Sequence, residues 1–273
     1  MFDFYFGTKE EIERDPAHYL VTIKRMLPRW CNSIPDSEFL AIHDLLGSAE
    51  LPRHPVFMET GSGASTIVLA YWALATGGEL FTWDIDGAKL AFLRSVINDT
   101  LMRHFTERNL FTHWRYTAFS STSDHAGVPI LSELGKEVSF AFFDSEHTLD
   151  TLMREMKAAC DMIRSGGIVA IDDGNYTYLH ENTAYVNVVR KKQGLPPIPE
   201  TPGNTGRQFW IEVGDYLEER FRKVEYIDDS YKKTYQSDIF WAYFRSDRET
   251  MASLAMEKTG ELDHRFDAWR VFR

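Results

Sequence analysis

The chain has 273 residues, and its 41 acidic residues against 30 basic ones give it a net charge of −11. An acidic surface disfavours nonspecific binding to nucleic acid or to an anionic membrane, because phosphates require a basic face. A hydrophobic content of 44%, with 14% aromatic residues, is enough for a sizeable core and excludes a mainly disordered chain. This composition is typical of an acidic cytosolic protein that binds a small molecule.

Targeting and redox features agree with that interpretation. No stretch approaches the roughly 18 apolar residues of a membrane span, and residues 1–14 carry acidic side chains where a signal peptide is basic and then apolar. Cys31 and Cys160 are the only cysteines and form no CxxC pair, so neither a zinc-thiolate site nor a disulfide framework is indicated. We therefore expect a cytoplasmic protein that binds neither membranes nor nucleic acid.

Residues 1–54 are predicted to form a helical cover. A helix begins after Pro35 and continues through Leu46, with Phe39, Ile42 and Leu45 recurring every three or four residues. These helices would also offer a surface for a homodimer. No motif that carries chemistry lies in this segment.

From Val56 the chain alternates between predicted strands and predicted helices. The strands are expected at Val56–Glu59, Leu80–Ile85, Trp114–Phe119, Val138–Phe143 and Ile168–Ile171, with helices at Ser65–Thr76, Ala88–Phe105 and Leu149–Arg164. Strands that alternate with helices at this spacing form a parallel sheet with helices on both faces.

The chain after Gly174 is less regular. We expect a helix near Glu181–Lys192, a Pro- and Gly-rich loop at Gly194–Gly206 of the kind that forms lids, final strands at Phe209–Val213 and Asp238–Phe244, and a short helix and tail over Glu249–Arg273. The predicted fold class is α/β, a Rossmann-like doubly wound, mostly parallel seven-stranded sheet with an N-terminal helical cover and C-terminal additions. We place domain boundaries at 1–54, 55–245 (with 175–208 as a lid or insertion) and 246–273.

Carboxylates follow most of the predicted strands. In doubly wound sheets, ligands bind beyond the carboxyl ends of the strands. Five segments lie at such ends: Glu59–Thr66, Asp84–Asp86, Ser120–Asp124, Asp144–His147 and Asp172–Asn175. Four of the five have a carboxylate at or just past the strand end, so the ligand site is expected to be acidic.

A glycine-rich turn, Gly61-Ser62-Gly63, joins the first predicted strand to its helix. Glycines let the backbone approach a ligand, and the start of a helix offers free N–H groups. Glu59, just before the turn, would repel a pyrophosphate but attract a cationic amino group, and Thr66 replaces the third glycine of the dinucleotide fingerprint. Asp84, at the end of the next strand, is placed to bind two ribose hydroxyls.

The motifs at these strand ends resemble those of a known family. Val56–Thr66 and Phe81–Asp86 are similar to the first two motifs of class I S-adenosylmethionine-dependent methyltransferases. Phe142–His147 and Gly166–Asp173 resemble the fourth- and fifth-strand motifs of the small-molecule O-methyltransferase branch. That branch includes catechol-type enzymes and the group related to macrocin O-methyltransferase and cephalosporin hydroxylase.

The resemblance implies S-adenosylmethionine as the cofactor and methyl transfer to a hydroxyl of a small molecule. The cofactor-binding residues that it implies are Glu59, Gly61, Ser62, Gly63, Ser65, Thr66, Asp84, Ile85 and, by a looser match, Ser121 and Thr122. The alternative interpretation of Glu59 and Asp84 is a helix cap or a surface carboxylate, and that of Ser121 and Thr122 is an ordinary polar loop.

Three carboxylates indicate a metal site. Asp144 follows the fourth strand, and Asp172 and Asp173 follow the fifth, 28 residues later, so that adjacent strand ends can bring them together. Carboxylates in one place repel each other unless a cation neutralises them, and oxygen ligands suit Mg²⁺ or, as a substitute, Mn²⁺. In catechol-type enzymes such a metal chelates the hydroxyls of the acceptor, which lowers their pKa.

His147 lies three residues after Asp144, where the catechol-type pattern has a basic residue, commonly lysine, that removes the proton of the acceptor. An imidazole can serve as such a base near neutral pH. We therefore predict Asp144 and His147 as catalytic residues. The competing interpretation is that His147 only orients the helix that follows it.

Four alternatives to a metal-dependent methyltransferase stay open. A metal-independent methyltransferase would keep the cofactor residues. An NAD(P)-dependent oxidoreductase is disfavoured by the missing third glycine and by Glu59, and a hydroxylase by the lack of a pattern that resembles a 2-His-1-carboxylate iron site. In a different class, the chain would be a noncatalytic cofactor-binding subunit of an assembly.

Overall fold

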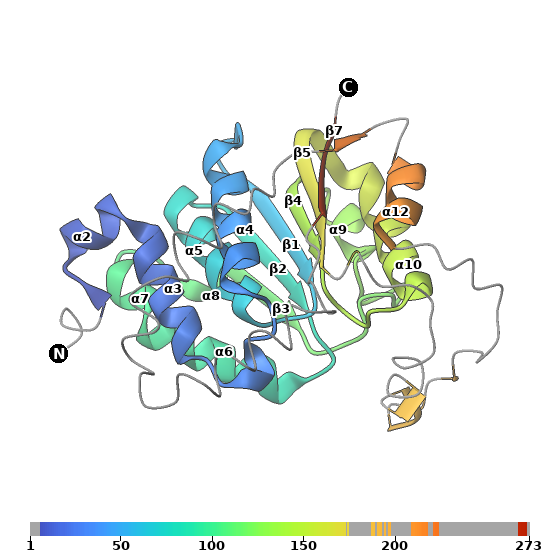
Figure 1. Cartoon of the computed structure of the whole chain (residues 1–273), viewed down its shortest axis with the longest axis horizontal. Coiled ribbons are helices and arrows are strands. Elements are labelled where there is room, and N and C mark those ends of the chain that lie inside the picture. The colour runs from blue at the N-terminus through green and yellow to red at the C-terminus, as the bar shows by residue number, and fades with distance from the viewer. Residues whose placement is uncertain are drawn as a thin grey trace, which may run out of the picture.

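The computed structural model describes residues 6–172, 174, 187–188, 190–192, 194, 196–197, 209–217, 221–223 and 267–271. These residues form a central sheet between two layers of helices (Figure 1). Its strands are β1 (Val56–Thr60), β2 (Glu79–Trp83), β3 (Trp114–Thr117), β4 (Val138–Phe143), β5 (Ile163–Ile171), β6 (Phe221–Lys223) and β7 (Asp267–Val271).

The order of the strands is β3-β2-β1-β4-β5-β7-β6. Neighbours from β3 to β5 are parallel, whereas β7 runs antiparallel to both β5 and β6. The predicted α/β class with a mostly parallel, doubly wound sheet is confirmed. The crossovers place the carboxyl ends of β1 to β5 at one edge of the sheet.

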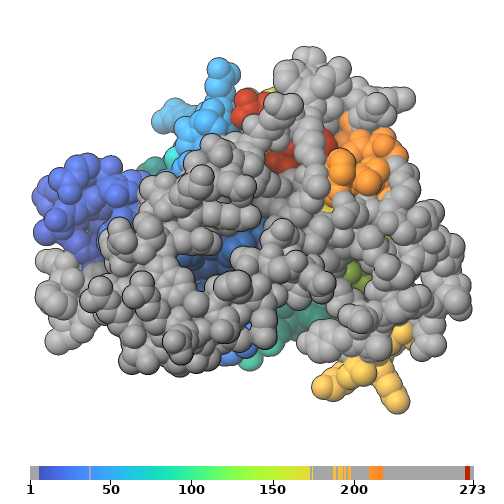
Figure 2. Space-filling model, viewed as in Figure 1, coloured from blue at the N-terminus to red at the C-terminus, as the bar shows by residue number. Residues whose placement is uncertain are grey.

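Helices cover both faces of this sheet. One layer contains α2 (Lys9–Arg14), α3 (Pro16–Met26), α4 (Asp36–Ser48), α5 (Ala64–Thr76), α6 (Gly87–Asp99), α7 (Leu101–His104) and α8 (Leu110–His113), with the 3₁₀ turn η1 (Arg29–Cys31) between α3 and α4. The other contains α9 (Ile130–Glu133), α10 (Leu149–Ala159), the 3₁₀ turn η2 (Cys160–Met162) and α12 (Phe209–Leu217). Figure 2 shows the N-terminal helices in blue and α12 in orange at opposite ends of one face.

The alternation of side chains along the strands explains the two layers. In β4, Phe140 and Phe142 are buried in the core that contains α5, whereas Ala141 and Phe143 are buried in the core that contains α10. Successive strand residues point to opposite faces, so a strand that is apolar throughout can be buried on both sides. The predicted helix after Pro35 is present as α4, which packs with α3 on α5.

The expected strand at Phe209–Val213 is wrong, because these residues begin the helix α12. Its buried side chains, Phe209, Val213 and Leu217, are four residues apart, which is the period of a helix and not of a strand. A short apolar run does not distinguish a strand from a helix. Here the four-residue spacing of the buried side chains indicates the helix.

The C-terminal segment also differs from the expectation of a helix and a tail. Residues 267–271 form β7, whose Ala268 and Trp269 are buried in the two cores on opposite faces. The sheet therefore includes residues beyond 245, where we expected the domain to end. The predicted strand Asp238–Phe244 and most of the predicted helix Glu181–Lys192 lie outside the described residues.

Two further boundaries differ. The helix expected over Ala88–Phe105 is divided at Thr100, whose backbone (φ −119°, ψ −81°) is not helical and whose hydroxyl donates to the carbonyl of Val96 at 2.6 Å. The helix expected to reach Arg164 ends at Ala159, and β5 already begins at Ile163. Within the part of the chain that the structure describes, no helix is long and apolar enough to cross a membrane.

Candidate functional site

The glycine-rich turn lies at the carboxyl edge of the sheet, directly after β1. Gly61 has a φ of +80°, and its N–H donates to the carbonyl of Trp83 at 2.8 Å. A Cβ on Gly61 would lie 1.8 Å from the carbonyl oxygen of Asp144, and one on Gly63 would lie 3.2 Å from that of Cys31. The turn is thus held between the loop after β4 and the N-terminal helices, and only glycine fits at Gly61.

Asp84 organises this turn. Its Oδ2 accepts from the backbone N–H of Ser62 at 2.9 Å and from the Ser62 hydroxyl at 2.6 Å, and it lies 3.4 Å from Lys89 Nζ. Its Oδ1 accepts from the N–H of Asp86 at 2.8 Å, and Asp86 in turn caps α6. The expected contact with ribose hydroxyls stays a prediction, and a ribose would have to share this carboxylate with Ser62.

Glu59, in β1 just before the turn, has a fully buried side chain. Its two oxygens accept from Ser65 Oγ and from Thr82 Oγ1, each at 2.8 Å. Burial raises the pKa of Glu59 to about 7, and hydrogen bonds from Thr66, Ser65 and Thr82 oppose that rise. Thr66 Oγ1 also accepts from the N–H of Gly63 at 3.0 Å. These residues shape the turn, and their expected contact with the cofactor stays a prediction.

Two exposed apolar side chains follow β2 and β3 at the carboxyl edge of the sheet. Ile85 is 51% exposed and Phe119 is 53% exposed. The register pairs Trp83 with Thr117, and the N–H of Asp84 donates to the carbonyl of Thr117. Ile85 and Phe119 each come two residues after one member of this pair. The sequence predicts that Ile85 lies against an adenine. For Phe119 it predicts only the last position of a strand.

The structure adds a residue that sequence reasoning missed. Glu155 of α10 is 1% exposed, and its oxygens accept from Thr60 Oγ1 at 2.9 Å and from the hydroxyl of Ser121. Burial raises the pKa of Glu155 to about 7, while hydrogen bonds from Ser121, Ser145 and Thr60 lower it. The signal in the sequence was an acidic residue on the apolar stripe of a helix, next to positions that should be buried.

We expect the hydroxyls of Ser121 and Thr122 to lie near the cofactor. The hydroxyl of Ser121, however, donates a hydrogen bond to another residue of the protein. Its side chain is buried and bonded to Glu155, and Thr122 Oγ1 lies 3.0 Å from the hydroxyl of Ser120. The backbone of Ser121 is nevertheless part of the loop that follows β3 at the same edge of the sheet. A cofactor contact through this loop stays a prediction.

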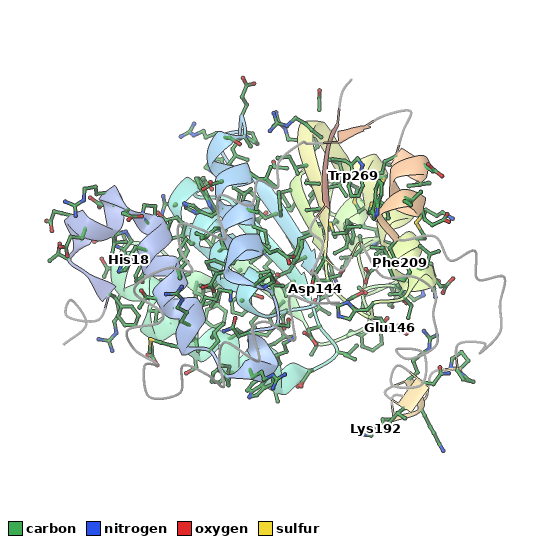
Figure 3. All side chains as sticks on the ribbon, in the orientation of Figure 1. His18, Asp144, Glu146, Lys192, Phe209 and Trp269 are labelled. Atoms are coloured by element: carbon green, nitrogen blue, oxygen red, sulfur yellow. The ribbon has the colours of Figure 1, made fainter. Side chains whose placement is uncertain are left out.

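Asp144, His147 and Asp172 lie in the segments that follow β4 and β5. The N–H of Asp144 donates to the carbonyl of Thr60 at 2.8 Å, and that of Asp172 donates to the carbonyl of Phe143 at 3.1 Å, so the two aspartates follow adjacent strands. His147 Nε2 lies 3.7 Å from Asp144 Oδ1. Figure 3 shows Asp144 at the end of the strands and Glu146 beside it, toward α10.

His147 adopts an unusual backbone conformation. Its φ is +54°, and among the described residues it is the only one other than glycine with a positive φ. A left-handed conformation is uncommon for residues other than glycine, costs free energy, and often occurs at functional sites. Here it turns the chain so that the imidazole reaches back toward Asp144.

The expected metal triad is only partly described. Asp144 and Asp172 are on adjacent strand ends, but Asp173 lies outside the described residues. Among the residues that the structure describes, no group of three His, Cys, Asp or Glu side chains is arranged to hold a metal ion. Two carboxylates at one edge are oxygen donors that suit Mg²⁺, so the metal site stays a prediction.

An ion pair joins the loop after β4 to the segment expected to be a lid. Arg190 Nη1 lies 2.7 Å from Glu146 Oε1, and Arg190 Nε donates to the carbonyl of Pro196 at 2.8 Å. The second oxygen of Glu146 accepts from Thr151 Oγ1 at 2.9 Å. Glu146, two residues after Asp144, therefore holds part of this segment next to the loop after β4.

The part of the chain that contains these residues is similar to a known protein family. Residues 58–174 match a family model described as a methyltransferase domain. That segment contains the glycine turn together with Asp84, Asp144, His147 and Asp172. No curated protein matches the sequence.

Several solved structures are similar in fold at low sequence identity. An rRNA methylase from Streptococcus thermophilus is 11% identical with a TM-score of 0.47, over 88% of this chain and 99% of that one. An O-methyltransferase from Bacillus cereus in complex with SAH is 16% identical with a TM-score of 0.40, over 82% and 91%. CalS11, a TDP-rhamnose 3′-O-methyltransferase of calicheamicin biosynthesis, is 17% identical with a TM-score of 0.40, over 70% and 90%.

Proposed function

We propose that this chain is an S-adenosylmethionine-dependent methyltransferase that acts on a hydroxyl of a small molecule. The observation that supports this most is the match of residues 58–174 to a methyltransferase domain. The matched segment contains the glycine turn and the described carboxylates that follow β2, β4 and β5, which together form the candidate site. The net charge of −11 favours a small-molecule acceptor over nucleic acid.

The cofactor would lie on the turn between β1 and α5. S-adenosylmethionine supplies a methyl group on a positively charged sulfonium, and the carboxylates Asp84 and Asp144 give this edge of the sheet the complementary charge. Gly61 and Gly63 let the backbone approach the aminoacyl part. Asp84 would bind the ribose hydroxyls, and Ile85 would pack against the adenine.

The acceptor would lie on the other side, near Asp144 and His147. The imidazole of His147 would take the proton of the acceptor hydroxyl, and Asp144, whose Oδ1 is 3.7 Å from Nε2, would stabilise the imidazolium that results. Asp144, Asp172 and Asp173 would hold Mg²⁺, or Mn²⁺ in its place. The ion would orient the hydroxyl and lower its pKa.

Calorimetry with S-adenosylhomocysteine, and with NAD⁺ in parallel, tests the cofactor half of this proposal. We expect S-adenosylhomocysteine to bind and NAD⁺ not to bind, because Glu59 and Thr66 disfavour a pyrophosphate at the turn. Glu133→Gln, on the exposed surface of α9, is the control and should bind like the wild type. Binding of NAD⁺ alone would support the oxidoreductase alternative instead.

A radiolabelled methyl donor tests the acceptor and the metal. Label should appear in hydroxylated small molecules in the presence of Mg²⁺, and EDTA should abolish the transfer. His147→Ala should lose transfer while it retains S-adenosylhomocysteine binding. Transfer that is unchanged by EDTA would contradict the role of Mg²⁺ and favour the metal-independent alternative. Label that appears only in RNA would contradict the small-molecule acceptor.

A further inference from the structure

The buried carboxylate of Glu155 joins three segments that are far apart in the sequence: the end of β1, the loop after β3 and the loop after β4. Thr60, which precedes the glycine turn, is 95 residues from Glu155 and donates to it at 2.9 Å. Ser121, in the loop after β3, is 34 residues away and donates to the other oxygen. Ser145, next to Asp144, also hydrogen-bonds to it. One side chain thus contacts the chain at the ends of β1, β3 and β4.

The loop after β3 contacts Glu155 through Ser121 and is otherwise held by bonds of its own. The carbonyl of Ser121 accepts from the N–H of Val128 at 2.8 Å, and a Cβ on Gly127 would lie 2.1 Å from the same oxygen, so the loop is closed tightly on itself. Trp83 Nε1 donates to the carbonyl of Ala126 at 2.8 Å. Together with that bond, the bond from Ser121 to Glu155 holds the closed loop against the sheet.

Burying the carboxylate of Glu155 costs free energy unless hydrogen bonds compensate for its desolvation. Glu155 is 1% exposed and Thr60 is fully buried, so an apolar residue of similar size would fill the same space without any charge to desolvate. What the carboxylate adds is a pair of acceptors, one for the hydroxyl of Thr60 at the end of β1 and one for that of Ser121 in the loop after β3. Its geometry therefore serves the relative placement of these two segments.

We infer that Glu155 is a positioning residue, which fixes the loop after β3 against the glycine turn so that the adenine end of the cofactor meets a preformed surface. The inference rests on the proposed function, because it assigns the loop after β3 to the adenine. Glu155 itself is buried and does not touch the cofactor. It acts through the hydroxyls of Ser121 and Thr60.

Binding of S-adenosylhomocysteine and of adenosine, measured by calorimetry on the full chain, tests this assignment. Glu155→Leu removes both acceptors and should weaken both ligands by the same factor, about ten-fold or more, as for the loss of hydrogen bonds to a charged group. Glu155→Gln retains an acceptor and a donor for the two hydroxyls and should restore most of the affinity. Glu133→Gln again serves as the control.

A double-mutant cycle separates positioning from general stability. Ser121→Ala should weaken binding, and the double variant Glu155→Leu/Ser121→Ala should bind no more weakly than Glu155→Leu, because both changes break the same link. Losses that add would overturn the assignment, and so would wild-type affinity in a folded Glu155→Leu. If Glu155→Leu does not fold, Ser121→Ala tests the link alone, and wild-type affinity for both ligands in that variant would overturn the assignment. Failure of the wild type to bind either ligand would instead overturn the proposed function, and the assignment with it.

Discussion

The end of β1 is held by a buried glutamate on each face of the sheet, and the two glutamates differ in where their partners come from. Glu59, on the α5 side, accepts from residues only 6 and 23 positions away. Glu155, on the α10 side, accepts from residues 34 and 95 positions away. Burial raises the pKa of both carboxyls to about 7. The α5 side is therefore a local motif, whereas the α10 side is assembled from distant loops.

The largest loss of stability and of ligand binding is expected from a substitution at Gly61, where the glycine turn meets the loop after β4. Gly61→Ala would place a Cβ 1.8 Å from the carbonyl oxygen of Asp144 at a φ of +80°. We expect it to lower the free energy of unfolding by about 3 kcal/mol or more, as strain and overpacking combine, and to abolish binding of S-adenosylhomocysteine. Urea unfolding and calorimetry measure the two effects.

Gly135→Ala is the matched control for that variant. Gly135 also has a positive φ, +62°, but a Cβ there would have nothing within 4 Å. It should cost only the backbone penalty, about 1 kcal/mol, with unchanged ligand binding. Equal losses in the two variants would show that the close approach of Asp144 contributes nothing.

Stability should depend on pH through both glutamates. A carboxyl with a raised pKa in the folded state binds more protons there than in the unfolded chain, so its contribution is complete below about pH 4.5 and is lost as the pH rises to about 7. Each group should contribute a decrease of roughly 3 kcal/mol over that range. Urea unfolding at several pH values measures the decrease.

Glu59→Gln and Glu155→Gln sharpen the comparison of the two sides. Each should remove part of the pH-dependent decrease, because the amide does not titrate. The two variants should resemble each other in this respect despite the different origin of their partners. If the free energy of unfolding of either variant decreased with pH as much as that of the wild type, the raised pKa of that residue would be contradicted.

His147 belongs to the α10 side alone, and its substitution should separate stability from activity. His147→Gly should increase the free energy of unfolding by about 1 kcal/mol, because glycine adopts a positive φ without strain, while methyl transfer is lost. His147→Ala should lose transfer without that gain. Urea unfolding and a transfer assay distinguish these outcomes, and full transfer by either variant would exclude His147 as the base.

The smallest effect is expected at the ion pair of Glu146 with Arg190, which is partly exposed. Arg190→Ala should change the free energy of unfolding by less than about 1 kcal/mol. It should raise the KM of the acceptor without changing affinity for S-adenosylhomocysteine, because Glu146 of the pair lies in the loop of Asp144 and His147, where we propose that the acceptor binds. Lys192→Ala, in the same segment, is the control, and a shift in cofactor affinity would contradict this division of the site.

The difference between the two sides also explains what the sequence could predict. The glycine turn and the position of Asp84 follow from the order of residues within one strand, turn and strand, so local reasoning was sufficient. The alternation of strands and helices likewise predicted the α/β class. Glu155 could not be assigned a role in this way, because its partners are distant in sequence and only the folded chain brings them to one carboxylate.

The errors in the C-terminal half have a similar cause. Phe209–Val213 is apolar enough for a strand, and the helix α12 is indicated only by the four-residue spacing that places Phe209, Val213 and Leu217 in one core with residues of α10 and β7. The strand β7 is five residues long and pairs with Ile168–Ile171, about a hundred residues earlier. Such a short segment has no periodicity that would distinguish it from a tail.

The placement of β7 between β5 and β6 affects the order in which the chain can fold. During synthesis, β1 to β5 are complete well before residues 267–271 emerge from the ribosome, and β6 pairs with β7 rather than with β5. Until then β5 is an open edge strand with unpaired backbone groups, which can recruit other chains. Among the described strands, it is β7 that covers this edge of β5, so the edge stays open until residues 267–271 are synthesised.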